Sequence, residues 1–343
     1  MNHRVIWQET GQSFEVDEGE AVLEAALRCQ VALPHECQLG GCGSCRVKVV
    51  EGAVAYPSEE GEPADLPMGL TPEEAEAGFA LACQARPASD LVISVAAPLT
   101  CSSPTRVSAT VEAVQALTPD VTHLCLRLPD EAQLVYRPGQ YMNVQLGDGR
   151  HRSFSMASRP NGGLVDFHVR RIPGGTFTEK RLPTLRAGQT LDVELPHGSF
   201  GFHAEDYRPL LMVATGTGLA PIKSMLEALM DDEDCPPVSL YWGMRTEADL
   251  YLHEEIQQWA ARLYEFKYVP VLSQASAQWT GRRGYVQHAV MEDLQDLSEY
   301  AIYLCGSPAM INEAKVAFSH GGASLDHVYA DAFLFQPADE PLP

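Results

Sequence analysis

Residues 37–45 are Cys37-Gln-Leu-Gly-Gly-Cys42-Gly-Ser-Cys45, and a fourth cysteine follows in Leu81-Ala-Cys83-Gln. The spacing is C-x4-C-x2-C with one distant cysteine, the pattern in which thiolates hold the two irons of a plant-type [2Fe-2S] cluster. The glycines between the first three cysteines permit positive φ angles. A loop curled in this way can turn backbone N–H groups toward an anion. The four cysteines therefore predict an iron–sulfur centre.

Two other uses of these cysteines fit less well. Zinc sites usually space their ligands as two C-x2-4-C pairs, which the sequence does not contain here. A disulfide framework is typical of small secreted domains, whereas this chain has 343 residues. After the cluster takes four of the nine cysteines, we expect the rest to be buried thiols or ligands: Cys29, Cys101, Cys125, Cys235 and Cys305.

Size and composition describe an ordinary globular chain. The length predicts two or three domains, and 45% hydrophobic with 20% charged residues is a common balance. No apolar run approaches the ~18 residues that cross a bilayer, and residues 1–9 lack the apolar core of a secretory signal. We expect a cytoplasmic protein with no membrane partner.

The net charge of −22 is unevenly distributed. Residues 1–100 hold 16 acidic and 5 basic residues, residues 101–207 hold 11 of each, and residues 208–343 hold 19 and 8. Acidic surfaces repel nucleic acid, so we expect no such partner. The acidic first part either steers the protein toward a basic redox partner or only keeps it soluble.

The hydrophobic pattern changes twice and predicts three modules. Alternation over residues 4–7 and 12–16 predicts a hairpin, spacing over 20–29 a helix, and 45–50 and 91–95 strands. The acidic, Pro-rich residues 58–76 are expected to form a surface excursion, and residues 97–104 a linker.

The second module has short strands and turns, which is typical of an antiparallel barrel or sandwich. The expected strands span 107–114, 122–128, 141–146, 164–171 and 191–195, with one short helix near 176–181. In the third module, strands alternate with helices, which predicts βαβ units and a parallel sheet covered on both faces. Its strands span 210–214, 238–242, 266–272 and 301–305, and its helices begin near Pro221, Glu247, Tyr285 and Pro308.

A glycine turn joins a strand to a helix in Thr215-Gly-Thr-Gly-Leu-Ala-Pro221. Backbone N–H groups and the helix dipole bind pyrophosphate at such turns, and proline suits a first helical turn. The sequence is not the G-x-G-x-x-G fingerprint. Dinucleotide binding and tight packing therefore both remain open.

Three short segments of the second module carry polar groups: Arg152-Ser-Phe-Ser155, His168-Val-Arg170 and Pro173-Gly-Gly-Thr-Phe-Thr178. An arginine, two hydroxyls and a helix start opened by glycine can hold a diphosphate, and a phenylalanine can stack on a flat ring. The alternative is an exposed arginine on an ordinary strand and a phenylalanine in the core.

Two features lie near the C-terminus. Cys305-Gly-Ser-Pro308 ends a predicted parallel strand, where ligands bind in such sheets; a lone cysteine there can equally be a small buried residue. The last expected ordered piece is 328–335, whose aromatic residues either face a flavin or pack in the core.

In chain order these motifs resemble a plant-type ferredoxin module joined to a ferredoxin–NADP reductase-like unit. The chain is most similar to reductase components of bacterial ring-hydroxylating dioxygenases, of the naphthalene and terephthalate type, along its whole length. This resemblance implies a multidomain α+β and α/β fold. Residues 1–97 would form a β-grasp ferredoxin-like domain, residues 104–206 an antiparallel FAD-binding β-barrel, and residues 207–336 a doubly wound parallel NAD(P)-binding domain.

The resemblance also implies roles for matching residues. The cluster ligands would be Cys37, Cys42, Cys45 and Cys83. Arg152 would pair with the FAD pyrophosphate, Ser155 would lie near the reactive N5, and Phe154 would stack on the flavin where the family often has tyrosine. The rest of the FAD site would comprise Ser153, His168, Val169, Arg170, Gly174, Gly175, Thr176 and Thr178.

For the dinucleotide, the implied residues are Thr215, Gly216, Thr217, Gly218 and Pro221 at the pyrophosphate, with Cys305, Gly306 and Pro308 near the nicotinamide. Asp331 would lie near the hydride path and Phe333 near the flavin. The residues expected closest to the chemistry are Ser155, Cys305 and Asp331.

The implied activity is an NAD(P)H:acceptor oxidoreductase. A hydride carries two electrons, whereas metal oxygenases accept electrons singly. A flavin can accept two electrons and release them one at a time, and a [2Fe-2S] cluster carries a single electron. The expected route runs from nicotinamide to FAD to the cluster and then to a terminal oxygenase or ferredoxin component. No general acid–base pair or nucleophile is required.

The nicotinamide and the acceptor leave alternatives open. Arg245 would favour the 2′-phosphate of NADPH or have no role, whereas Leu272-Ser-Gln274 lacks the arginine that follows serine in photosynthetic relatives, so we expect NADH. Other acceptors are a diiron monooxygenase or a deoxysugar-forming enzyme. A carrier or redox sensor without turnover is a different class, and the Gly216 turn and Cys305 argue against it.

Overall fold

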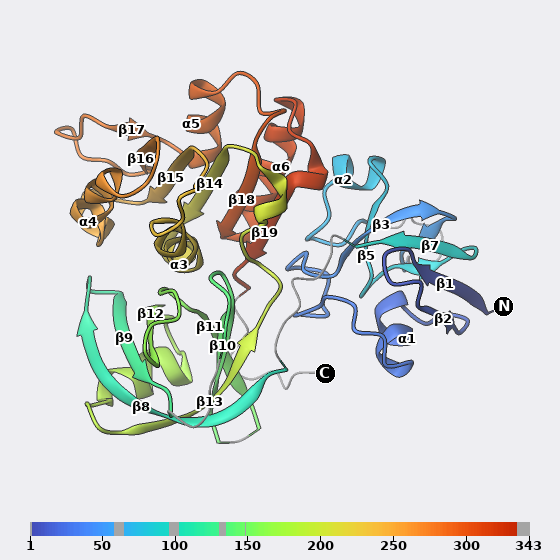
Figure 1. Cartoon of the computed structure of the whole chain (residues 1–343), viewed down its shortest axis with the longest axis horizontal. Helices are drawn as coiled ribbons and strands as arrows, with labels where there is room; N and C mark the ends of the chain where they lie inside the picture. The colour runs from blue at the N-terminus through green and yellow to red at the C-terminus, as the bar shows by residue number, and fades with distance from the viewer. Residues whose placement is uncertain (1, 58–64, 96–102, 130–134, 148, 335–343) are drawn as a thin grey trace.

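The computed structural model describes residues 2–57, 65–95, 103–129, 135–147 and 149–334. Residues 58–64 of the expected surface excursion, residues 97–102 of the expected linker, Cys101 and Phe335 lie outside this part. Three main sheets, of five, six and six strands, divide the chain in sequence order (Figure 1). The predicted fold class is confirmed.

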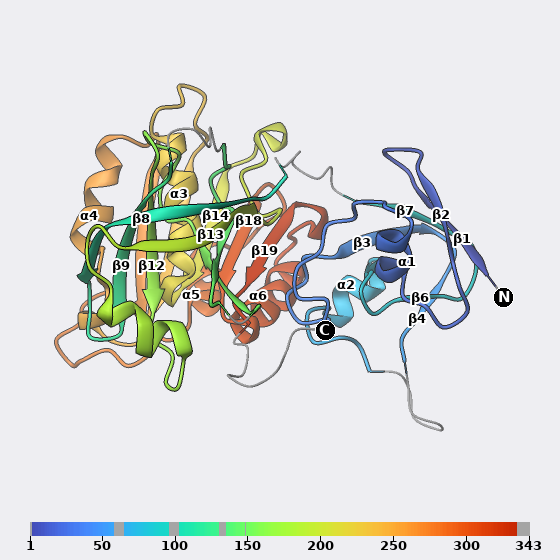
Figure 2. The same cartoon turned by 90° about the horizontal axis from the view of Figure 1, so that it is seen from below.

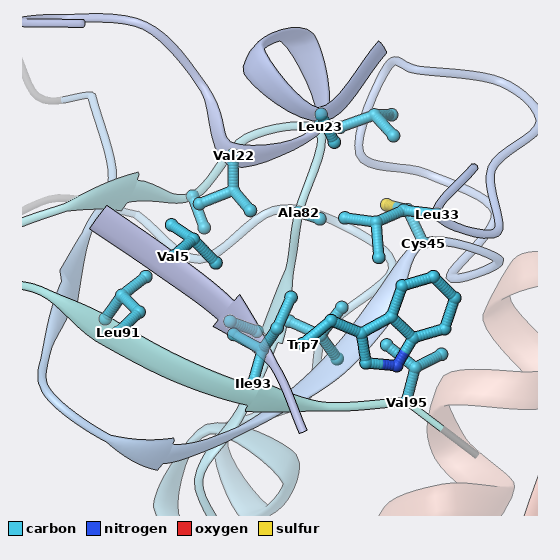
Figure 3. Packing of buried hydrophobic residues seen from close by; sticks show 14 of the residues in the cluster. Val5, Trp7, Val22, Leu23, Leu33, Cys45, Ala82, Leu91, Ile93 and Val95 are labelled. Carbon is cyan, nitrogen blue, oxygen red and sulfur yellow. The ribbon is translucent and has the colours of Figure 1, made fainter. Parts of the chain in front are cut away.

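The first module is a mixed sheet in the order β2-β1-β7-β3-β5, with β1 and β7 parallel. The predicted hairpin and helix are present. Alternate residues of β1 and β2 are buried, and Val22 and Leu23 of α1 pack with them and with Ile93 (Figure 3). Its elements are β1 His3–Trp7, β2 Ser13–Val16, α1 Val22–Arg28, β3 Arg46–Glu51, β4 Val54–Ala55, α2 Pro72–Glu76, β5 Phe79–Leu81, β6 Arg86–Pro87 and β7 Leu91–Ser94.

The prediction of a surface excursion is wrong at its C-terminal end. Thr71 caps α2 in a reciprocal capping box: its Oγ1 accepts from the N–H of Glu74 at 3.2 Å, and Oε2 of Glu74 accepts from the N–H of Thr71 at 3.0 Å. The side chain of Glu74 is fully buried. Acidic composition therefore concealed a short, well-capped helix.

The second module is an antiparallel barrel in the order β11-β10-β13-β8-β9-β12. A bridge between Met156 and Phe167 joins the chain after β11 to β12 and brings the two edges of the sheet together. The helix expected near residue 176 is a π-helical turn, Thr176–Arg181. Five strands agree with the predicted spans: β8 Thr105–Ala116, β9 Val121–Arg127, β10 Tyr141–Gln145, β12 Leu164–Arg170 and β13 Thr190–His197. The sixth, β11 His151–Ser155, is the segment that contains Arg152 and Ser155.

The third module is a parallel sheet in the order β17-β16-β15-β14-β18-β19. Apolar residues of α3 and α4 pack on one face, and those of α5 and α6 on the other. The strands β14 and β18 are almost wholly apolar because both faces are covered. The elements are β14 Leu210–Thr215, α3 Leu219–Leu229, β15 Val238–Met244, α4 His253–Gln258, β16 Phe266–Leu272, β17 Arg282–Arg283, α5 Val286–Asp293, β18 Ala301–Gly306, α6 Pro308–His320 and β19 Val328–Ala332.

One predicted helix start in this module is wrong. A single 3₁₀ turn, Glu247–Asp249, stands where a helix was expected, and α4 begins only at His253. Leu250 has ψ 63°, outside the helical region, so the turn cannot continue.

The first module lies against α6 and β19 of the third, and the barrel lies beside α3 (Figures 1 and 2). Nζ of Lys223 donates to the carbonyl of Ala157 at 3.0 Å, and Oγ of Ser224 to that of Ser158 at 2.6 Å. Both bonds join α3 to the barrel. Within the described part of the chain, no helix has the length and apolar character needed to cross a bilayer.

Candidate electron-transfer site

The four predicted metal ligands are brought together in two pairs. The thiol of Cys42 hydrogen-bonds to Cys37, and that of Cys45 hydrogen-bonds to Cys83. Cys42 and Cys45 are buried, while Cys37 and Cys83 are half-buried. Of the remaining cysteines that the structure describes, Cys125, Cys235 and Cys305 are buried as expected. The expectation is wrong for Cys29, which is exposed because it lies at the C-terminal end of α1.

The loop backbone donates to the sulfurs. The N–H of Leu39 lies 3.3 Å from Sγ of Cys37. Together with the Cys42 thiol, the N–H groups of Leu39, Gly41 and Cys42 lower the pKa of Cys37 to about 5. Gly40 has φ +74°, and a Cβ there would lie 2.8 Å from the side chain of Gln84, beside Cys83. The loop thus needs glycine to bring its N–H groups to the thiolates.

These residues fit a [2Fe-2S] cluster better than one zinc ion. Two pairs of thiols, with N–H donors aimed at them, suit two irons held by four thiolates.

The segment expected to bind the flavin lies on β11. Its neighbour β10 pairs Ser155 with Tyr141 and Ser153 with Asn143. Oγ of Ser153 donates to Oδ1 of Asn143 at 2.7 Å, and Nη1 of Arg152 donates to the carbonyl of His151 at 2.7 Å. The ring of Phe154 lies 5.3 Å from that of Phe177.

The glycine-opened helix start is held by its own side chains. Oγ1 of Thr178 accepts from the N–H of Ile172 at 3.1 Å, and Oε2 of Glu179 accepts from that of Gly174 at 2.7 Å. Gly175 needs to be glycine because a Cβ would lie 2.5 Å from Oγ1 of Thr178. Thr176 is half-buried in the first turn.

On β12, Val169 lies in the barrel core, while the side chains of His168 and Arg170 reach the third module. Nδ1 of His168 is 3.2 Å from the hydroxyl of Tyr251. Burial, with Lys223 and His123 nearby, lowers the pKa of His168 to about 3. A Cβ on Gly216 would lie 3.6 Å from Nη1 of Arg170.

The glycine turn packs closely on the end of β18. A Cβ on Gly218 would overlap the carbonyl of Cys305, and one on Gly306 would overlap Oγ1 of Thr215. Gly216 has φ +58°, and its carbonyl accepts from Nε1 of Trp242 at 3.0 Å. Thr217 is half-buried in the turn, and Pro221 is buried in the first turn of α3. The turn therefore serves packing as well as leaving backbone at the carboxyl edge of the sheet.

Cys305 and Asp331 are neighbours on β18 and β19. Sγ of Cys305 lies 3.9 Å from Oδ2 of Asp331, and both side chains are buried. Burial and the Asp331 charge raise the pKa of the Cys305 thiol, and burial raises the pKa of Asp331 to about 7. The N–H of Phe333 donates to the carbonyl of Gly306 at 2.8 Å. Pro308 begins α6.

Arg245 is exposed at the end of β15, and its carbonyl accepts from the N–H of Gln274 at 2.8 Å. It lies beside the end of β16 and is not among the groups gathered around Cys305.

Glu36 and Tyr141 lie where the modules meet, and no sequence pattern pointed to either of them. A Cβ on Gly198 of the barrel would lie 2.9 Å from Tyr141 and 3.3 Å from Oε1 of Glu36, next to Cys37. A cavity of about 290 Å³ is lined by all three modules, Glu36, Phe200 and Asp331 among them. Only the structure distinguishes Tyr141, by pairing it with Ser155 across β10 and β11.

The cysteine loop also touches the end of the third module. A Cβ on Gly41 would lie 3.0 Å from Cδ1 of Leu334, which follows Phe333 directly. The loop that fits a cluster is therefore in contact with the segment that carries Asp331 and Phe333.

Three family models match consecutive parts of the chain. They are the 2Fe-2S iron-sulfur cluster binding domain over residues 5–88, the oxidoreductase FAD-binding domain over 108–202 and the oxidoreductase NAD-binding domain over 212–315. The chain is 34% identical to the CDP-6-deoxy-L-threo-D-glycero-4-hexulose-3-dehydrase reductase of Yersinia pestis, across 97% of this chain and 99% of that protein. The chain belongs to the ferredoxin-fused FAD- and NAD-binding reductases.

A second relative of this reductase is the terephthalate 1,2-dioxygenase reductase component 2 of Comamonas, with 33% identity across 98% of this chain and 99% of that protein. The crystal structure of the Amycolatopsis cytochrome P450 reductase GcoB matches with a TM-score of 0.70 and 30% identity, covering 98% and 100% of the two chains. The predicted [2Fe-2S], FAD and NAD(P)H cofactors and the oxidoreductase class are confirmed.

His168 makes the stability of the reductase depend on pH. Its pKa is about 3 in the fold, against ~6.5 when unfolded. Its contribution is therefore fully present above pH ~6.5 and is lost as the pH falls from 6.5 toward 3, by up to ~1.4 kcal/mol per pH unit. We expect the His168→Gln variant to lose less stability than the wild type between pH 7 and pH 5 in urea unfolding. Equal losses in the two proteins would contradict this assignment; His288→Gln, at an exposed position, is the control.

Proposed function

We propose that this reductase takes electrons from NADH and passes them, one at a time, to the oxygenase or ferredoxin component of an aromatic-ring-hydroxylating dioxygenase. The contact of the cysteine loop with Leu334 carries the proposal. It joins the proposed cluster ligands to the segment with Asp331 and Phe333, so that a short path would run between the cluster and the flavin. NADH and unpaired thiols belong to reducing compartments, which supports a cytoplasmic location.

The chain's own residues would bind and orient the cofactors and shield them from water. Bound FAD supplies the conversion of a two-electron hydride into single electrons, and a [2Fe-2S] cluster carries one electron. Arg152 and the start of the π-helical turn at Thr176 would meet the FAD phosphates, and the turn at Gly216 the NADH pyrophosphate. Buried Cys305 and Asp331 would exclude water from the reacting rings.

NADH rather than NADPH is supported by the surroundings of Arg283, which pairs with Leu272 at the end of β16. Both terminal nitrogens of Arg283 donate within its own loop, Nη1 to the carbonyl of Ala275 and Nη2 to those of Ser276 and Trp279. That guanidinium is therefore engaged. Oε1 of Glu247, on the neighbouring loop, accepts from Oγ of Ser276 at 2.6 Å and adds negative charge there, which disfavours a 2′-phosphate.

A second acceptor class is a sugar dehydrase, favoured by the relative in Yersinia pestis; a diiron monooxygenase is a further alternative. The two leading candidates separate by kcat/KM for NADH oxidation with a purified Rieske-type oxygenase and with a purified hexulose dehydrase. The proposal expects the oxygenase to be preferred, and preference for the dehydrase would overturn it.

The acceptor would dock over apolar residues beside the cysteine loop. Leu39 is 62% exposed and Met68 61% exposed, and Cε of Met68 would lie 3.1 Å from a Cβ on Gly41. Leu66 is exposed on the same segment as Met68. Because the surrounding module is acidic, the matching surface of the acceptor protein would have an apolar centre and a basic rim.

Cys42→Ser tests the order of electron transfer. It removes one cluster ligand, so we expect NADH to reduce the flavin at the usual rate while cytochrome c reduction falls to background, in stopped-flow and steady-state assays. Cys29→Ser, at an exposed cysteine outside the loop, is the control. If cytochrome c reduction survived in Cys42→Ser, the electrons would not pass through the cluster.

Leu39→Glu tests the docking surface. A buried charge at an apolar contact should raise the KM for the acceptor protein about tenfold, equivalent to ~1.4 kcal/mol, and leave ferricyanide reduction unchanged. Leu27→Glu is the matched control, because Leu27 is exposed on α1 of the same module. An equal KM in the two variants would argue against docking at Leu39.

A further inference from the structure

A buried carboxylate joins the first and third modules. Glu74 of α2 is fully buried, and its Oε1 lies 2.7 Å from Nη1 of Arg46 and 3.0 Å from Nζ of Lys315. Lys315 belongs to α6 of the NAD-binding module, and its side chain is only 3% exposed. The described side chains here thus form a triad of two cations and one anion.

This triad carries a net charge of +1. Arg46 is further satisfied by the carbonyls of Leu325 and Val328, at 3.2 and 2.8 Å, and by the ring of Phe79. The N–H of Thr71 also donates to Glu74. A buried charge left uncompensated is strongly unfavourable, so the excess positive charge calls for a nearby anion.

The side chain of Lys315 points that charge at the cysteine loop. Nζ of Lys315 would lie 3.8 Å from a Cβ on Gly43, between Cys42 and Cys45. The same lysine lines the cavity between the modules together with Gly43 and Ser44. Four thiolates around two irons form an anionic group, and reduction adds one more negative charge to it.

We propose that Lys315 is a tuning residue for the cluster, a fixed cation that the NAD-binding module supplies and that raises the reduction potential of the cluster. This inference rests on the electron route proposed above. In the step concerned, one electron leaves the flavin and enters the cluster, and no bond forms or breaks. A nearby buried cation favours the reduced cluster, because net charge and burial set the potential of such centres.

The position of Lys315 makes this effect depend on docking. The helix α6 starts at Pro308, directly after the Cys305–Gly306 strand end, and reaches the cysteine loop at Lys315. Only the docked ferredoxin module has the cation beside its cluster. The reduction potential of the cluster is therefore raised in the docked arrangement, in which the cluster receives an electron from the flavin.

Substitutions of opposite charge test the proposal on the holoenzyme. Each potential is measured by dithionite titration with mediators, followed by EPR of the reduced cluster. Lys315→Met should lower the equilibrium constant for one-electron reduction about tenfold, which is ~59 mV. Glu74→Gln leaves two unopposed cations and should raise this equilibrium constant by a similar factor. The double variant restores the net charge of +1 and should return near the wild type.

The sign of these shifts separates tuning from a structural role. If the contact were merely structural, the reduction potentials of both single variants would shift in the same direction, or neither would shift. That result would overturn the proposal. Lys315→Arg keeps the charge and should keep the potential; it also covers the case in which Lys315→Met fails to fold. Lys48→Met removes a cation at the same interface, but one that is 38% exposed and paired with Asp326, so its shift should be smaller; an equal shift would contradict the account.

These titrations need neither NADH nor an acceptor protein. Failure of the proposed function would appear as an NADH-reduced flavin that does not reduce the cluster. Failure of the tuning role would appear as unchanged or same-sign potentials in a cluster that NADH does reduce.

Discussion

Glu74 has no exposed surface and lies between cations from two different modules. Although burial raises it, the charges of Lys315 and Arg46 hold the pKa of this carboxyl below its usual value. Removing one partner of such a buried pair costs about 3–5 kcal/mol. The capping box at Thr71 fixes the short helix that carries Glu74. Arg46 then reaches past it to the carbonyls of Leu325 and Val328. The ferredoxin module is thereby fixed on the NAD-binding module.

This docking also sets two contacts of the site. It sets the cysteine loop against Leu334. It also brings Glu36 to Tyr141 of the barrel, opposite Ser155 on the strand proposed for the flavin. The parallel sheet contributes the carboxyl ends of β14, β18 and β19, where Gly216, Cys305 and Asp331 lie. This interface and the contact of α3 with the barrel together position parts of three sheets, although each sheet is built on its own hydrophobic core.

The sequence predicted what depends on local patterns. Cysteine spacing, the turn at Gly216 and the alternation in β1 and β2 are each set within a few residues. The hydrophobic pattern also predicted an antiparallel second module and a parallel third module, whereas the β-grasp class of the first rested on the family resemblance. Lys315 could not be recognised, because its partner Glu74 is 241 positions away and a lysine on an amphipathic helix has no distinguishing pattern. Glu74 had a local pattern in Thr71-Pro-Glu-Glu74, but the acidic composition of residues 58–76 indicated a surface segment instead. The roles of individual cofactor-binding residues still stand as proposals.

The docked arrangement can be tested by the rate of electron transfer from the NADH-reduced flavin to the cluster, followed by stopped-flow in increasing sucrose. If the ferredoxin module stays on α6 and β19, no large motion precedes the transfer, and the rate should not change with solvent viscosity. A rate that fell in proportion to viscosity would mean that the module must swing before the electron moves, and would contradict the account.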